Sequence, residues 1–368
     1  MNFSIVRKIR WSDPLILLVV TLVGIGLLTG ISIFNKKYIA KYKPRTRTYY
    51  IAAENVEWNY APAGKDPSTG MPLPEPWGIQ TKYQKTRYIE YTDATFQKKK
   101  PQPKWLGILG PIIRGVEGDT LKVVFFNNTL KPYSMHPHGV LYDKDNEGAI
   151  HDIAADENKN HQMGTGAIVY PTKKHTYTWV VRPEAAPTAA EGGSKVWMYH
   201  SHVDAVADIY EGLIGPIIIT RAENANEDAT PNDVDQEFVN LFMVFNESQD
   251  GMTDDQIEGS LKHSINGYIF HNLSGLEMKQ NDRVRWHLIG MGTEVDLHTP
   301  HWHGEVVREN GHYTDVVDLL PATMKSVDMV AKNVGEWMYH CHVADHITAG
   351  MVAMYSITGS DHSMEEHH

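Results

Sequence analysis

Residues 340–354 read HCHVADHITAGMVAM and contain the only cysteine of the protein, Cys341. His346 follows this cysteine by five residues and Met351 follows it by ten. A lone cysteine is usually a small buried hydrophobe, but a thiolate, two imidazoles and a weak axial thioether are the ligands of a blue-copper electron-transfer site. This stretch would supply three of those ligands from one loop between two strands. The sequence therefore predicts a type 1 copper site, and His298 in DLHTPHWHGE fits the remaining imidazole.

Two further histidines, His340 and His342, stand on either side of the cysteine. In a strand, the neighbours of a residue point to the face opposite its own. The two imidazoles should then face away from the copper that the Cys341 sulfur binds. We therefore expect a second metal centre on that opposite face, joined to the first by a short covalent path.

The histidine motifs belong to an internal repeat. HSH at 200–202 matches HCH at 340–342, and HPH at 136–138 matches HWH at 301–303. The segment WMYHSHVDAVADIYEGLIG parallels WMYHCHVADHITAGM almost residue for residue. In this register the first copy has Tyr133, Ser201, Val206 and Glu211 in place of His298, Cys341, His346 and Met351. The first copy thus lacks every blue-copper ligand, whereas the eight histidines of the four motifs are the number that a three-copper cluster needs.

These motifs, together with stretches such as ENVEWNYAP, HPHGVLYDKDNEGAI and HSINGYIFHNLSGLEM, resemble the multicopper oxidases over residues 48–358. The resemblance is closest to the ceruloplasmin and clotting-factor branch. It implies copper-dependent oxidation of a reductant, coupled to four-electron reduction of O2 to water. It also implies four coppers per chain, one of type 1, one of type 2 and two of type 3. By resemblance, His136 and His301 would hold the type 2 copper. The type 3 pair would be held by His138, His200, His202, His303, His340 and His342.

The pattern of the chain predicts an all-β fold. Short β-rich runs, such as 120–128, 213–220 and 351–358, alternate with Pro/Gly turns, which is typical of sandwiches and barrels. With the resemblance, we expect two cupredoxin-like Greek-key β-sandwich or barrel domains after one N-terminal transmembrane helix. The expected division is a tail at 1–13, an anchor at 14–34, a basic linker at 35–47, domain 1 without type 1 copper at 48–222, a linker at 223–236, domain 2 with type 1 copper at 237–359 and a tail at 360–368.

The anchor is predicted from PLILLVVTLVGIGLLTGISIF, residues 14–34, which are uncharged and would span about 31 Å as a helix. No A-X-A-like cleavage site follows, which favours an uncleaved anchor over a signal peptide. The basic residues after the span would keep the C-terminal side in the cytoplasm by the positive-inside rule, whereas the resemblance implies an extracytoplasmic oxidase. We expect a single-pass membrane protein with extracytoplasmic copper domains. The formal net charge of −11 argues against nucleic-acid partners.

Four further residues are expected at the reaction sites because of the resemblance. O2 reduction needs protons, and the family carries an acidic residue nine positions after the second histidine of the first motif, here Glu147. Iron-oxidising members carry a carboxylate and histidine site beside the type 1 copper, and the matching residues are Glu258, His263 and Asp345. Such ligands suit Fe(II) and stabilise Fe(III) more. The expected reductant is therefore Fe(II), with O2 as the acceptor.

The resemblance also leads to an expectation about assembly. In the family, the two halves of the three-copper cluster face one another across a domain interface. In a chain with only two domains, that interface is expected between subunits. A homotrimer with interfacial clusters would reproduce the six-domain ring of ceruloplasmin.

Other functions remain open at this stage. A laccase-like oxidase would act on phenols or amines, and a cuprous oxidase would act on Cu(I), although the fifteen methionines form no Met-rich loop. A copper nitrite reductase needs only a blue copper and one three-histidine centre, which would leave most of the histidine motifs unused. A non-catalytic binding scaffold, as in the clotting-factor relatives, would not need the complete ligand set. Copper content would separate the laccase-like and cuprous oxidases from the nitrite reductase. The oxidases would hold about four coppers per chain and the reductase about two.

Overall fold

The computed structural model describes residues 42–150, 164–293 and 295–359. The predicted anchor at 14–34, both predicted tails and most of the basic linker lie outside the described residues. The described residues from Pro44 onward belong to one compact unit. Within the described ranges, no helix is both long and apolar enough to cross a bilayer.

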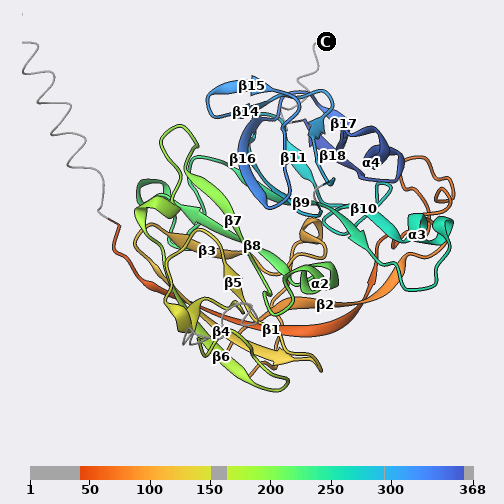
Figure 1. Ribbon diagram of the computed structural model, residues 1–368. Coiled ribbons are helices and arrows are strands. Elements are labelled where there is room, and N and C mark those ends of the chain that lie inside the picture. The colour runs from red at the N-terminus through yellow and green to blue at the C-terminus, as the bar shows by residue number, and fades with distance from the viewer. Residues whose placement is uncertain (1–41, 151–163, 294, 360–368) are drawn as a thin grey trace, which may run out of the picture. The chain divides into compact units, whose positions relative to one another are not determined.

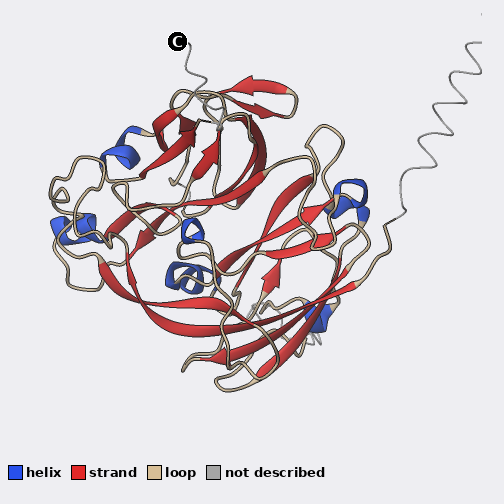
Figure 2. Cartoon of the chain, turned by 180° about the vertical axis from the view of Figure 1, so that it is seen from behind, coloured by secondary structure: helices blue, strands red, loops and turns tan. Residues whose placement is uncertain are grey.

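The regular secondary structure of the described chain is mostly β-strand, with only short helices, as predicted (Figures 1 and 2). The strands of the first half are β1 Thr46–Asn59, β2 Lys82–Tyr91, β3 Ile113–Val116, β4 Thr120–Asn128, β5 His136–Pro137, β6 Lys174–Val180, β7 Ser194–His200 and β8 Ile214–Thr220. Those of the second half are β9 Gln236–Asn246, β10 Leu261–Ile265, β11 Glu277–Lys279, β12 Arg283–Gly290, β13 Pro300–Trp302, β14 Val307–Glu309, β15 His312–Thr314, β16 Thr323–Val330, β17 Gly335–Cys341 and β18 Val352–Thr358. Short α-helices are α2 Ala205–Glu211, α3 Asp254–Ser260 and α4 Ala344–Thr348.

The two halves repeat one topology. The first half has the sheets β2-β1-β4-β6 and β3-β8-β7-β5, and the second has β10-β9-β12-β16-β14-β15 and β11-β18-β17-β13. In each half the first long strand pairs in parallel with a later one, β1 with β4 and β9 with β12. The antiparallel pairs β5–β7 and β13–β17 set His136 opposite His200 and His301 opposite His340. The sheet register thus brings the His-X-His motifs of each half together.

Each half has its own core, and a third core joins the halves. Alternate residues of β4, Leu121, Val123 and Phe125, are fully buried in the first-half core, as expected of a strand with one face toward a core. Every residue of β8 is buried. One of its faces contributes to the first-half core, and the other face packs in the third core with β9 residues such as Leu241 and Phe245. A strand covered on both faces needs an apolar run, and IGPIIIT supplies it.

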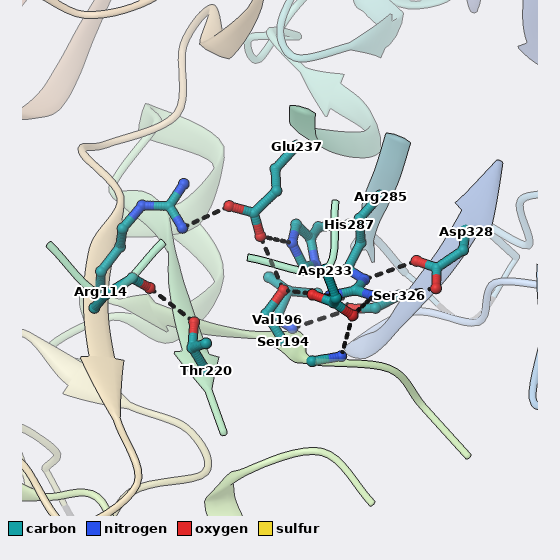
Figure 3. A network of polar contacts seen from close by, with 12 residues as sticks. Arg114, Ser194, Val196, Thr220, Asp233, Glu237, Arg285, His287, Ser326 and Asp328 are labelled. Atoms are coloured by element: carbon teal, nitrogen blue, oxygen red, sulfur yellow. Dashed lines mark hydrogen bonds and ion pairs between the residues drawn. The ribbon is translucent and has the colours of Figure 1, made fainter. Parts of the chain in front are cut away.

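A buried polar network also crosses between the halves (Figure 3). Arg285 is fully buried and donates to Asp233 at 2.8 Å and to Asp328 at 2.7 Å. Glu237 accepts from Arg114 of the first half at 2.7 Å. A buried charge is tolerated when its partners are in place. The network therefore favours one arrangement of the two halves.

Candidate metal centres

The structure brings His298, Cys341 and His346 into one buried group whose ligand atoms lie within 4.8 Å of one another. Cys341 is the last residue of β17, His346 lies on α4, and Met351 precedes β18. The Sγ atom of Cys341 lies 3.6 Å from Nδ1 of His346. Met351 is fully buried in the same core as Cys341. The connection that the sequence suggested as a loop therefore contains a short helix, which presents His346.

His298 is fixed so that one ring nitrogen is left for a metal. Its Nε2 lies 3.1 Å from the carbonyl oxygen of Met291 and donates to it, which leaves the lone pair on Nδ1. That Nδ1 is buried and has no hydrogen-bond partner among the described residues. Burial lowers the pKa of His298 to about 4, so the imidazole is neutral, as a metal ligand must be. An orphaned buried nitrogen beside a thiol fits a copper site.

The thiol of Cys341 has a backbone donor. Thr299 N–H donates to Sγ at 3.3 Å. Burial raises the pKa of Cys341, and this amide acts in the opposite direction. Metal binding would deprotonate the thiol outright. In the first half, Ser134 N–H donates to Ser201 Oγ at 3.1 Å, so the same backbone geometry is present without the sulfur.

Oxygen-based hydrogen bonds fill the first-half position that corresponds to the group of His298, Cys341 and His346. Ser201 Oγ donates to Asp208 at 2.6 Å, and the hydroxyl of Tyr133 donates to Glu211. Burial and the bond to Glu211 raise the pKa of Tyr133. This position therefore carries hydroxyl and carboxylate groups where the second half carries imidazole and sulfur.

The first-half histidines converge on one point. Nε2 of His138 lies 3.2 Å from Nε2 of His200, and His136 belongs to the same group. The ring of His202 stacks on that of His200 with centroids 5.6 Å apart. Burial lowers the pKa of His138 to about 4 and that of His200 to about 3. Neutral imidazoles whose nitrogens meet in this way suit a shared metal.

The second-half histidines repeat this arrangement. Nε2 of His303 lies 3.0 Å from Nε2 of His340, and His301 completes the group. The ring centroid of His342 is 5.2 Å from that of His301. Burial lowers the pKa of His340 to about 4. Among the described residues, the first-half and second-half sets form two separate groups.

Strand β17 connects the group of His298, Cys341 and His346 to the second-half histidines. His340 and Cys341 are consecutive, and Nδ1 of His340 donates to the carbonyl oxygen of Cys341 at 2.7 Å. The Cys341 sulfur lies with His346, whereas the His340 ring lies with His301 and His303. The two groups thus lie on opposite faces of one strand and share its backbone.

Sequence reasoning missed the backbone carbonyls that orient the imidazoles. Nδ1 of His136 lies 2.7 Å from the carbonyl oxygen of Glu147, and Nδ1 of His301 lies 2.8 Å from that of Asp315. The side chain of Glu147 pairs with Lys144 at 2.8 Å. The described contacts therefore place Glu147 beside the histidine group through its main chain. Any residue offers a carbonyl, so no side-chain pattern could have signalled this role.

The residues expected at the reductant site line one cavity of about 690 Å³. Glu258 of α3 and Asp345 of α4 are exposed at its wall, and His263 of β10 is buried. The ring centroid of His263 is 5.1 Å from that of His346. Burial lowers the pKa of His263 to about 4, and its Nδ1 has no hydrogen-bond partner in the described chain. First-half residues Trp77 and Tyr210, which the sequence did not single out, complete the wall.

Comparison with known families bears on the fold and the family of the chain. Two family models, both described as multicopper oxidase, match residues 89–224 and 243–360. A crystal structure of a multicopper oxidase has a TM-score of 0.58 with 20% identity, covering 85% of this chain and 89% of that chain. The multicopper oxidase mgLAC has a TM-score of 0.57 with 19% identity, covering 88% and 90%. These similarities support the predicted cupredoxin-like fold.

Curated relatives are more similar in sequence but much longer. Human ferroxidase HEPHL1 is 40% identical over 343 residues, which are 85% of this chain and 29% of the relative. Human hephaestin is 36% identical over 343 residues, again 85% and 29%. Mouse ceruloplasmin is 35% identical over 347 residues, 84% and 31%. The chain therefore spans less than a third of the length of these relatives.

Proposed function

This chain belongs to the multicopper oxidase family, and we propose that it couples one-electron oxidation of Fe(II) to four-electron reduction of O2 to water. We assign a type 1 copper to His298, Cys341, His346 and Met351, and a three-copper cluster to the His-X-His motifs, giving four coppers per chain. Bound copper would supply one-electron transfer at the first site and O2 reduction at the second. The observation that carries the proposal is the placement of the Cys341 thiol and the His340 imidazole on opposite faces of β17.

The protein's own side chains have distinct tasks in this reaction. Backbone carbonyls fix the rings of His298, His136 and His301, so each offers a chosen nitrogen. Glu147 is our proposed proton relay, because its main chain lies beside His136 and its side chain can take up a proton from water and pass it on. Its pairing with Lys144 would keep the ionised carboxylate oriented between transfers.

Fe(II) is the proposed reductant because of the cavity beside His346. Glu258, Asp345 and His263 offer two carboxylates and an unpartnered imidazole nitrogen in one wall. Carboxylates and imidazole favour Fe(III) over Fe(II), so product stabilisation would assist the loss of an electron. The names of the relatives HEPHL1, "Ferroxidase", and hephaestin add support for this substrate.

The test compares iron with a bulky phenol in the copper-loaded protein. Glu258→Gln and Asp345→Asn should each raise KM for Fe(II) about tenfold, the loss of about 1.4 kcal/mol of binding, and leave phenol oxidation unchanged. Asp255→Asn is the matched control, because Asp255 is an exposed carboxylate of α3 that does not line the cavity. Equal effects on both reductants, or none on iron, would favour a laccase-like oxidase instead.

We further propose that a homotrimer completes the three-copper cluster. Each half of the chain holds a separate group of histidines, so a second copy can bring a first-half group to a second-half group. Exposed apolar residues flank both groups at matching positions of the repeat, Leu141 and Val180 in the first half and Val306 and Val330 in the second. Exposed apolar surface beside an incomplete site indicates a contact surface.

We retain the single-pass anchor at 14–34 and an extracytoplasmic location as parts of this proposal.

A further inference from the structure

Two consecutive residues with left-handed backbone conformation lie against the proposed axial copper ligand. Phe270 and His271 have φ values of +47° and +60°, a region that bulky residues rarely adopt. Phe270 N–H donates to the carbonyl oxygen of Gly350 at 2.9 Å, and His271 N–H donates to that of Val352 at 3.0 Å. These acceptors stand on either side of Met351. The strained pair, Phe270 and His271, therefore holds the backbone on both sides of Met351 through hydrogen bonds.

These hydrogen bonds bring Phe270 into close contact with Gly350. Gly350 has a φ of +106°, and a Cβ on it would lie 2.8 Å from the Phe270 ring, so only glycine fits. On its other side, Met351 is held by hydrogen bonds to the segment that carries Cys341 and His346. Its N–H donates to the carbonyl oxygen of His346 at 2.9 Å, and Cys341 N–H donates to its carbonyl oxygen at 3.1 Å. Met351 thus lies between the metal-site loop and the strained pair.

A loop of the first half, which includes Asp66, binds the strained pair and the residue after it. Nδ1 of the His271 ring lies 2.9 Å from a carboxylate oxygen of Asp66, and both side chains are largely buried. The next residue, Asn272, accepts from Ala63 N–H at 2.9 Å and donates to the carbonyl oxygen of Lys65 at 3.1 Å. In Figure 1 this loop, orange, follows β1 and lies beside α3 and α4. Strained backbone persists where its surroundings over-determine it, and these three contacts do so.

We propose that Asp66 and His271 are positioning residues for Met351, through which the first half tunes the type 1 copper of the second half. This inference rests on the type 1 site of the proposed function. The axial ligand adjusts the reduction potential of a blue-copper site. A change in how tightly the Phe270–His271 backbone is held alters the position of the Met351 sulfur and hence that potential. Neither residue touches the reductant or the metal.

The experiment measures the type 1 reduction potential and the copper EPR spectrum of the full-length, copper-loaded protein. Asp66→Ala removes the acceptor of His271, and His271→Gly keeps the positive φ without strain but loses the imidazole. Both should shift the potential in the same direction, and the double variant should shift it no further, because the two residues act as one contact. Asp93→Ala is the matched control. Asp93 accepts a backbone N–H of its own turn at 2.8 Å, as Asp66 does, but pairs with no histidine of the described residues.

Unchanged potentials and EPR spectra in both single variants of a blue protein would overturn the inference and leave the type 1 site intact. A wild-type protein that binds copper without blue absorption would overturn the type 1 assignment itself. If Asp66→Ala does not fold, His271→Gly alone decides, because glycine is compatible with the backbone at that position.

Discussion

Individual backbone carbonyls decide which nitrogen each imidazole offers. The carbonyls of Met291, Glu147 and Asp315 each accept from one ring nitrogen of a histidine. The other nitrogen then carries a lone pair. Burial also lowers the pKa of His298 to about 4, so this imidazole is poorly able to accept a proton. The copper-free protein should therefore be sensitive to acid.

Acid should destabilise the copper-free protein well before its carboxylates are protonated. The pKa is held at about 4 or below for His138, His200, His263, His298 and His340. In the unfolded chain these groups titrate near 6.5, so the unfolded state binds more protons below that pH. Their contribution is complete above pH 6.5 and is lost as the pH falls toward about 4. Urea unfolding midpoints should fall across this window.

The pH window separates this effect from that of the buried carboxylate Glu237. Its pKa is lowered to about 2, against 4.5 when unperturbed, so its contribution is lost only below about pH 4.5. Bound copper competes with protons for the same nitrogens, and the copper-loaded protein should resist acid better. A constant unfolding midpoint between pH 6.5 and 4.5 in the copper-free protein would contradict the neutral, buried state of the histidines.

Cys341→Ser should abolish blue absorption and reduce copper by about one per chain, because a hydroxyl does not replace a soft thiolate. The protein should still fold. Thr299 N–H can donate to the new hydroxyl, as Ser134 N–H does to Ser201. The free energy of unfolding should fall by about 1–3 kcal/mol because no carboxylate corresponding to Asp208 is available. Copper analysis and urea unfolding check both effects. Ser201→Ala is the control and should retain the blue colour.

At the scale of strands and helices, the sequence predicted what local spacing can encode. The His-X-His motifs, the cysteine connection and the all-β class follow from patterns of a few residues. The walls of the cavity beside His346 do not follow from such patterns, because Trp77 and Tyr210 reach that cavity from the other half of the chain. The contact of Asp66 with His271 likewise joins residues 205 positions apart. Contacts between distant segments leave no periodic signal in one sequence.

The arginines of β12 offer a matched test of how the halves are held together. Arg285 is fully buried, pairs with Asp233 and Asp328, and donates to the Ser194 hydroxyl of the first half at 3.0 Å (Figure 3). Arg283 instead pairs with Asp235 at the exposed surface. Arg285→Ala should lower the free energy of unfolding by about 3–5 kcal/mol, because it leaves Asp233 without its cation and Asp328 with only the longer pair to Arg308. Arg283→Ala should cost at most about 1 kcal/mol. Comparable losses in the two variants would show that the network does not hold the halves.

At the scale of the whole molecule, the third core fixes the two halves through β8 and β9, while the two groups of histidines remain separate. In the proposed function, each of these two groups is one part of a cluster rather than a complete one. Closed rings form when such unlike surfaces meet head to tail between copies. The proposed trimer therefore follows from the repeat only if clusters form between chains.

Mixed assemblies can test this directly. His136→Ala disables the first-half group and His303→Ala disables the second-half group, so each variant alone should be inactive. When the two are co-expressed, an interface that joins the intact first half of one chain to the intact second half of another has a complete cluster. In randomly mixed trimers this holds for about a quarter of the interfaces, so about a quarter of the wild-type oxidase activity should return. Clusters built within single chains would give no recovery, because every chain in the mixture carries one disabled group.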